Sequence, residues 1–246
     1  GGWGYDQLEE VWKTPVTQTH NLSVNGGNER VRYFGAASYV DQQGFLEPMK
    51  YKKYNIRMNV TADITKDLEV FAGLAIYNNF TDYALDGSDT YGKLRIWQPD
   101  QPVYTNSGKY VDYGWIGNVG ARVDGKGTSG YDNVAMLKPQ AVFSATYKAP
   151  FLKGLSLKVS YSRSWTHNTE KEYYTNYDMM VMKKSGAHNH IISTDDADIV
   201  GVKKSTWVGK EYIQRYASWS GDKQFNVQLN FDRTFNDVHK VSAALV

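Results

Sequence analysis

The residues best suited to metal chemistry lie in one polar stretch of the chain. His188 and His190 stand two positions apart, and acids follow them at Asp195, Asp196 and Asp198. Carboxylates favour calcium whereas imidazoles favour zinc or copper, so the set is chemically mixed. We therefore expect a solvated loop with no metal and no other cofactor, and calcium in an outer loop is the weaker alternative.

Signatures of enzyme active sites are missing from the sequence. It has no Gly-x-Ser-x-Gly elbow, no P-loop and no His-Glu-x-x-His pair. Asp86 and Asp89 can be imagined as a pair of glycosidase carboxylates. Chance pairs of this kind are unavoidable among 26 acidic residues. We predict that the protein is not an enzyme.

Aromatic side chains are frequent and offer surfaces for recognition, because the chain has 19 Tyr, 9 Phe and 7 Trp. Aromatic faces stack on sugar rings or fill the pockets of a partner protein. The alternative is that they pack the loops against each other or against a partner. The candidate substrate contacts, all expected in long loops, are Trp97, Tyr104, Tyr110, Tyr113, Trp115, Tyr173, Tyr174, Tyr177 and Trp207.

Composition excludes several classes of protein. The balance of 28 basic and 26 acidic residues gives no electrostatic reason to expect nucleic acid. The absence of cysteine excludes disulfides and cysteine zinc sites. No apolar run reaches the roughly 18 residues of a transmembrane helix, but a barrel strand needs only about 9–11 residues of alternating character. The mean hydropathy of -0.56 looks soluble on its face.

The candidate residues must be positioned by secondary structure, and the sequence predicts strands that each have one apolar and one polar face. In residues 54–63, apolar side chains alternate with polar ones, which is the period of a strand. Similar alternation predicts strands near 17–26, 31–40, 68–77, 140–148, 155–165, 225–232 and from 241 onward. Arg163 is the one misfit on the apolar face of its strand, and we expect it to reach toward lipid headgroups.

The links between these strands alternate in length. Those at 27–30, 65–67, 149–154 and 234–240 are short and carry turn residues, whereas those near 78–136 and 166–222 are very long. A transmembrane barrel sorts its connections in this way, with short periplasmic turns and long outer loops. Aromatic residues near strand ends fit the girdles of such a barrel.

The polar faces predict a water-filled lumen. Arg57, Asn59, Lys158 and Gln228 are the side chains expected to face it, where they line a solute path or bond to water or to a plug. An open sheet edge cannot face hydrocarbon, because each unpaired backbone group there costs several kcal/mol. We therefore expect an all-β antiparallel transmembrane β-barrel segment, about eight strands of a larger barrel.

Three contiguous stretches are similar to one known family. Residues 20–30 read HNLSVNGGNER, residues 33–45 read YFGAASYVDQQGF, and residues 51–59 read YKKYNIRMN. This order resembles the "HNLSxSGG", "Y…S.GY..Q.G" and "YKRYNxRxN" strands of the SusC/RagA family of TonB-dependent outer-membrane transporters. Residues 64–68 look like the periplasmic turn that follows. The match spans residues 14–80, and beyond it only the strand rhythm agrees.

The resemblance implies a fold and an activity. It implies a barrel of about 22 strands around an N-terminal plug. Residues 1–16 would connect to an absent plug, and residues 17–246 would form part of the barrel. It also implies import of oligosaccharides, or less readily peptides, across the outer membrane of a Gram-negative bacterium. The implied partners are a SusD-like surface lipoprotein, the TonB complex and outer-membrane lipid.

A second interpretation belongs to another class of protein. Antiparallel sheets in water also alternate, with the apolar face covered by a protein core. A soluble β-rich carbohydrate-binding or adhesion module would show the same period. The two interpretations differ in whether the apolar face of the sheet is covered by protein.

Overall fold

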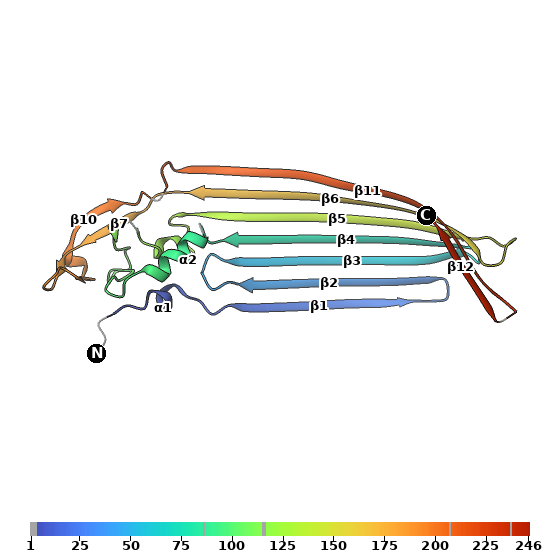
Figure 1. Ribbon diagram of the computed structural model, residues 1–246, viewed down its shortest axis with the longest axis horizontal. Coiled ribbons are helices and arrows are strands. Elements are labelled where there is room, and N and C mark those ends of the chain that lie inside the picture. The colour runs from blue at the N-terminus through green and yellow to red at the C-terminus, as the bar shows by residue number, and fades with distance from the viewer. Residues whose placement is uncertain (1–3, 86, 115–116, 207, 237) are drawn as a thin grey trace.

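One large antiparallel sheet dominates the computed structural model, which describes residues 4–85, 87–114, 117–206, 208–236 and 238–246. Long strands lie side by side, and the small helices gather at one end together with the short strands β7 and β10 (Figure 1). We call that end the outer end and the opposite end the inner end. Among the described residues, no helix is long and apolar enough to cross a membrane.

Eight strands form the sheet, in the order β1-β2-β3-β4-β5-β6-β11-β12. All neighbours are antiparallel. The sheet does not close on itself within the described residues, so β1 and β12 are its edges. Their bounds are β1 (Val16–Gly27), β2 (Val31–Gln43), β3 (Lys50–Thr65), β4 (Leu68–Tyr83), β5 (Gly130–Lys148), β6 (Leu155–Tyr174), β11 (Tyr212–Phe235) and β12 (His239–Leu245).

The inner turns are short because polar side chains close them locally. Asn28 accepts hydrogen bonds through Oδ1 from the backbone N–H groups of Arg30 and Val31, both at 2.9 Å. Thr65 Oγ1 accepts from the N–H groups of Asp67 and Leu68 in the same way. Such turns let consecutive strands pair without a longer connection.

The sheet is apolar on one face, and the described residues of this chain leave that face uncovered. Cross-strand partners Val60, Ala72, Phe143, Tyr161 and Phe225 form one row of it. Phe143 is 51% and Phe225 is 65% exposed, so large apolar side chains stand in the open. An uncovered apolar face of this extent marks a surface that meets lipid or another apolar partner. We call it the apolar face, and its opposite the polar face.

Aromatic rings border the outer part of the apolar face. The rings of Tyr39 and Tyr54 lie 4.9 Å apart, and His20 lies 6.2 Å from Tyr39. Phe80 meets Tyr54 edge-on at 6.3 Å. This band of rings corresponds to the girdle that a barrel places at the membrane interface.

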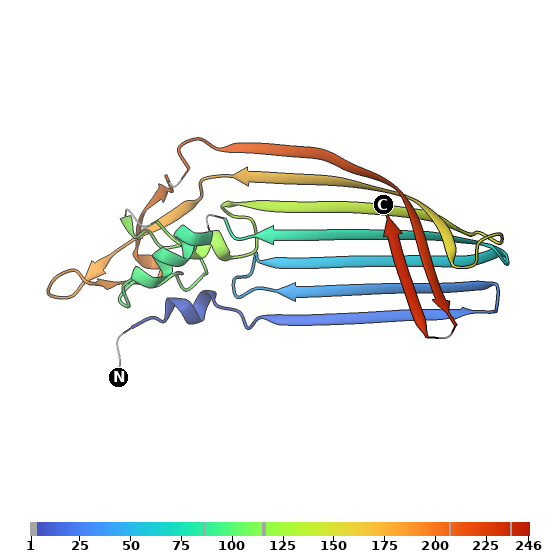
Figure 2. The ribbon, with the colours of Figure 1, turned by 45° about the vertical axis from the view of Figure 1, so that its right-hand side comes forward.

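The sheet is curved. In Figure 2 the inner part of β11 bends across the direction of the other strands, and β12 follows it. Strand twist of this kind is what allows a sheet to curl toward a barrel. The expected fold class, an antiparallel all-β segment of about eight strands, is confirmed by this eight-stranded antiparallel sheet, which stays open among the described residues.

The strands run further outward than their alternation predicts. β4 continues to Tyr83 and β5 begins at Gly130, while β6 continues to Tyr174 and β11 begins at Tyr212. The outer loops thus span 84–129 and 175–211, where we expected 78–136 and 166–222. The difference arises because polar and apolar side chains mix on both faces of the outer strand ends, as at Asn133 and Val134 of β5, so the alternation of a half-apolar strand is lost there. The division into a connection and a barrel domain stays a prediction.

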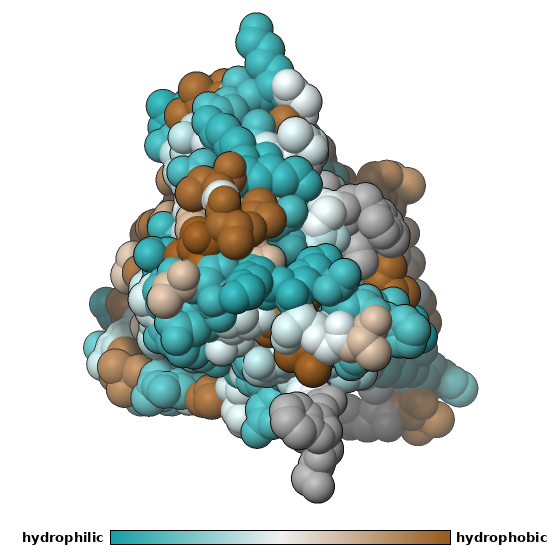
Figure 3. Space-filling view, turned by 90° about the vertical axis from the view of Figure 1, so that its left-hand side faces the viewer, coloured by the Kyte–Doolittle hydropathy of each residue, from teal (hydrophilic) through white to brown (hydrophobic). Residues whose placement is uncertain are grey.

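The outer loops and the N-terminal segment contain small elements. The helical elements are α1 (Gln7–Val11), α2 (Gly87–Ile96), α3 (Gly120–Val123) and the 3₁₀ turn η2 (Asp196–Asp198). The strand pairs are β7 (Asp178–Met182) with β10 (Ile199–Lys204) and β8 (Lys184–Ser185) with β9 (Ile191–Ile192). Figure 3 views this end, whose surface is mainly hydrophilic with apolar atoms in patches.

Candidate functional site

The two outer loops share a small hydrophobic core. Val103, Val111 and Val119 from the first loop are fully buried, and Met182 and Ile192 from the second pack in the same cluster. Burial of apolar side chains stabilises a folded loop as it does a domain core. The loops therefore form one packed structure above the sheet.

Three of the predicted aromatic contacts belong to this packed structure. Trp97 and Tyr113 are 5% and 8% exposed, and their rings meet edge-on at 4.9 Å. Tyr177 is 4% exposed and meets Tyr110 edge-on at 6.0 Å. Trp97, Tyr113 and Tyr177 thus pack within the loops, as the packing alternative describes, and their contact with a substrate stays a prediction.

Tyr104 and Tyr110 lie at the edge of the loop core. Their rings are 5.6 Å apart. The Tyr110 hydroxyl donates to Asp124 Oδ2, and burial together with that carboxylate raises the pKa of Tyr110. Tyr104 lines a hollow and is only partly buried, so it remains available for contact.

The remaining aromatic candidates lie elsewhere or outside the described residues. Tyr173 and Tyr174 belong to the outer end of β6, which corrects their expected place in a loop. Tyr174 stacks on Tyr212 of β11 at 5.0 Å. Trp115 and Trp207 lie outside the described residues.

Two hollows open where the loops meet the strands. A larger one of about 640 Å³ lies between the N-terminal segment, at Glu10 and Lys13, and the first outer loop, at Tyr104. A smaller one of about 260 Å³ lies between that loop and the outer ends of β4 and β5. Both are bordered by residues 124–126, so this short segment separates them. The smaller hollow carries both charges, from Lys50, Asp82, Arg122, Asp124, Lys126 and Asp132.

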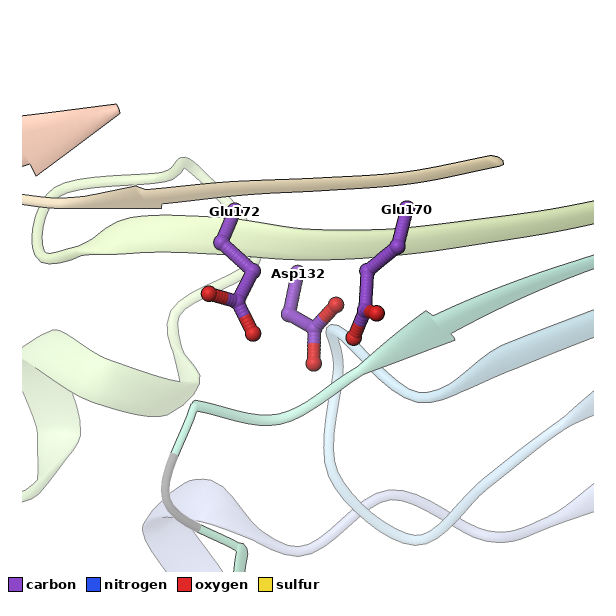
Figure 4. Close-up of side chains that lie close together, drawn as sticks. All are labelled: Asp132, Glu170 and Glu172. Atoms are coloured by element: carbon purple, nitrogen blue, oxygen red, sulfur yellow. The ribbon is translucent and has the colours of Figure 1, made fainter. Parts of the chain in front are cut away.

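Three carboxylates converge beside the smaller hollow. Asp132 of β5 pairs directly with Glu172 of β6, and Glu170 lies two residues further along the same strand. One oxygen from each of the three lies within 4.8 Å of the others. Figure 4 shows Asp132 between the two glutamates, with all three side chains pointing to the same side. Such a group attracts cationic parts of a ligand or a cation.

Burial and the two neighbouring glutamates change the titration of Asp132. Partial burial, followed by the charges of Glu170 and Glu172, raises the pKa of Asp132 to about 6. Its Oδ1 atom is buried and accepts no hydrogen bond within the described structure. Sequence reasoning missed this cluster, because its members come from two strands and only the pairing register brings them together. The signal in the sequence was the spacing of Glu170 and Glu172, which puts both on one face of a strand.

The polar side chains predicted to face a lumen share the polar face. Asn59 Oδ1 lies over Gly73, where an added Cβ would sit 3.0 Å from it. Arg57 and Asn59 line a hollow of about 250 Å³ on this face. Lys158 and Gln228 are direct cross-strand partners on β6 and β11. Their contact with a solute stays a prediction.

The acids that stand near His188 and His190 in sequence are engaged within the loop. Asp195 accepts from the backbone N–H of Ala197 at 3.0 Å and so caps η2. Asp196 accepts from Ser107 Oγ at 2.6 Å. Asp198 accepts from Ser193 Oγ at 2.7 Å. These carboxylates brace the loops, and His188 and His190 stand exposed to solvent.

Of the two carboxylates considered as a glycosidase pair, Asp89 is engaged in ion pairs. Asp89 forms ion pairs with Lys93 and with the buried Arg122, each at 2.9 Å. These contacts, the Lys93 hydrogen bond first, lower the pKa of Asp89 and keep it ionised. A general acid needs a raised pKa, so Asp89 is unsuited to that role. Asp86 lies outside the described residues.

Comparison with known proteins points to one kind of receptor, although no family model matches the chain. The chain is 26% identical over 106 residues to the TonB-dependent receptor SusC of Bacteroides thetaiotaomicron. It is also 26% identical over 176 residues to the TonB-dependent receptor P3 of Formosa agariphila. These matches cover 43% and 67% of the chain, but only 10% and 17% of the two receptors. The chain thus spans a small part of the relatives that it matches.

Solved structures share its fold. The RagAB peptide transporter superposes with a TM-score of 0.68 at 18% identity, covering 98% of this chain and 25% of that one. The RagAB peptide importer in its open-open state gives a TM-score of 0.67 at 16% identity, covering 98% and 24%. At such identities the likeness concerns the fold. The chain is therefore SusC/RagA-like: its sequence is similar to a segment of TonB-dependent receptors, and its fold is similar to a segment of the RagAB transporter.

Proposed function

We propose that the chain forms part of the barrel of an outer-membrane transporter that imports nutrient oligomers. The observation that carries this proposal is the uncovered apolar face, which is bordered by aromatic rings and spans strands whose long connections all lie at one end. A soluble module would bury such a face against protein. The similarity to TonB-dependent receptors supports the same assignment.

Within such a transporter, the strands and the outer loops have different roles. The paired strands supply a rigid wall whose polar face borders the solute path. The packed loops supply a shaped outer surface with hollows beside Tyr104 and Asp132. We infer that a SusD-like lipoprotein docks on these loops, that solute is captured between the two proteins, and that TonB drives a plug to let it pass.

Oligosaccharide is the first candidate substrate, since Tyr104, Tyr173 and Tyr174 keep partly exposed rings that can stack on sugars. Peptide is the second candidate, and a specific observation favours it. The carboxylate cluster of Asp132, Glu170 and Glu172 would attract the amino groups of a peptide, which neutral sugars lack. The fold neighbour RagAB is described as a peptide transporter.

Two measurements test the proposal. The natural full-length protein should fractionate with membranes and require detergent for extraction, whereas recovery from the soluble fraction would favour a carbohydrate-binding or adhesion module. A strain lacking its gene should lose growth on one nutrient class supplied as the only carbon or nitrogen source. Loss on oligosaccharides supports the first candidate, loss on peptides supports the second, and loss on neither contradicts nutrient import.

A further inference from the structure

Cations lie on the apolar face of β6 and β11, from the middle of these strands outward. Arg163 and Lys171 of β6 share this face with Arg215 and Lys223 of β11, because all four fall in register with Tyr161 and Phe225. The acids of the same two strands all take the polar face: Glu170, Glu172, Asp222 and Asp232. The outward side is therefore strongly basic at this place.

These cations oppose one another directly. Arg163 is the cross-strand partner of Lys223, and Lys171 is the partner of Arg215. Like charges placed directly opposite destabilise a sheet. None of the four forms an ion pair with any residue that the structure describes. A bound anion between the members of each pair would relieve this repulsion.

Aromatic rings contact Arg163 and surround the Arg163–Lys223 pair. The Arg163 guanidinium lies 4.6 Å from the centre of the Trp165 ring, a distance suited to a cation–π contact. His167 stacks on Trp219 at 3.8 Å, although Trp219 remains 76% exposed. Gly221, the partner of Trp165, adds no side chain between Trp219 and Lys223. The cluster is thus a braced and open surface.

The positions of the four cations along β6 and β11 match the expected boundary of a membrane. Arg163 is the ninth residue of β6, and Lys223 is the thirteenth residue from the inner end of β11. Below them the same face carries only apolar or aromatic side chains as far as Leu155 on β6 and Phe231 on β11. A barrel strand crosses the hydrocarbon in about 9–11 residues. The cations therefore begin where the strands leave the apolar layer on the outer side.

We propose that Arg163 and Lys223, with Lys171 and Arg215 further out, bind the phosphate groups of lipid headgroups in the outer leaflet. The inference rests on the proposed membrane location. Guanidinium and ammonium groups are suited to phosphate, arginine through paired N–H donors and lysine as a point charge. The indole rings of Trp165 and Trp219 suit the interface between acyl chains and headgroups. A lipid with several phosphates satisfies more of the four cations than one whose phosphate is balanced by an amine.

The test uses the natural full-length protein, purified in detergent and titrated with diphosphorylated lipid A. Lipid A freed of phosphate, with the same acyl chains, is the matched ligand, and native mass spectrometry counts bound lipid. We expect the phosphorylated form to bind more tightly and its binding to weaken as salt is raised. Since one basic residue near an anionic surface contributes about 1 kcal/mol, we expect R163Q/K223Q to lose affinity roughly fivefold for each cation removed.

A matched control lies on the same face of the same strand. Arg233, at the inner end of β11, packs its guanidinium over Phe235 at 4.7 Å, and R233Q should bind phosphorylated lipid A as the unmodified protein does. Equal binding of the two lipid A forms, or equal binding by R163Q/K223Q and R233Q, would overturn the inference and leave the transporter proposal intact. Recovery of the protein without detergent would overturn both. The salt dependence needs no variant, so it decides the matter even where R163Q/K223Q folds poorly.

Discussion

The hydroxyl of Tyr177 donates a hydrogen bond of 2.6 Å to the backbone oxygen of Asn118, and both residues are buried. Asn118 in turn donates through Nδ2 to the backbone oxygens of Val103 and Val111. Tyr177 belongs to the second outer loop, whereas the other three belong to the first. One buried contact therefore joins the two loops that would form the recognition surface.

Removing this contact should loosen the loops without unfolding the sheet. We expect Tyr177→Phe to lower the free energy of local opening by about 1 kcal/mol, since it leaves the Asn118 oxygen without that donor. Tyr177→Ala also removes a buried ring and should cost about 3–5 kcal/mol. Hydrogen exchange at residues 103–111 and 177–182 measures both. Equal exchange in all three proteins would show that the loops are held together elsewhere.

A second buried contact should make the first outer loop sensitive to acid. The side chain of Arg122 is 2% exposed and pairs with Asp89, whose pKa is lowered by Lys93 and by Arg122. An acid whose pKa is lowered by folding stabilises the folded state at any pH above its usual, unfolded-state pKa. This stabilisation is lost as pH falls through the folded-state pKa. Asp89→Asn should therefore make the loop easier to cleave by protease near neutral pH. At low pH, with an acid-active protease, the variant and the unmodified protein should be cleaved alike.

The sheet was predictable because side chains of a strand alternate between its two faces, and here one face is apolar and the other polar. Residues 54–63 alternate in sequence and lie in β3, with Ile56, Met58 and Val60 exposed on the apolar face. The outer strand ends were not predictable in this way. Around Asp132 and Glu172 polar and apolar side chains mix on both faces, so strand and loop look alike in sequence, and the backbone pairing is what identifies the strand.

The candidate site was less predictable than the fold. Aromatic type alone did not separate Trp97 and Tyr113, which pack in the loop core, from Tyr104, which borders a hollow. Burial of a loop residue depends on tertiary packing, and a local pattern does not encode it. Arg163 was the exception, since a lone cation on an apolar face stands out in sequence. Its partner Lys223 became visible only through the strand register.

The carboxylate cluster should couple the outer strand ends to pH. The pKa of Asp132 is raised to about 6 against a usual value near 4. A raised acid pKa means that the folded state binds the extra proton, so stability falls as pH rises between these two values. We expect local opening of residues 130–134 and 170–174 to become easier across that range. Hydrogen exchange at several pH values measures this trend.

A neutral variant should remove the trend. Asp132→Asn keeps the shape of the side chain and loses the charge, so its local opening should stay level from acid to neutral pH. Glu172→Gln should weaken the trend only in part, because partial burial contributes more than either glutamate to the raised pKa of Asp132. A trend that survives Asp132→Asn unchanged would assign the pH dependence to other groups.

The two faces of β11 provide a direct test of which side meets lipid. Val227 lies on the apolar face beside Val159, and its neighbour Asn226 lies on the polar face beside Ser160. If the apolar face meets hydrocarbon, Val227→Arg should destabilise the barrel by about 2–4 kcal/mol, since charge on the lipid face of a barrel is costly near the bilayer centre. Asn226→Arg places the same charge toward water and should cost far less. Urea titration of the full-length protein in lipid vesicles, read by heat-modifiable gel mobility, compares them; equal losses, or a larger loss for Asn226→Arg, would reverse the assignment of the faces.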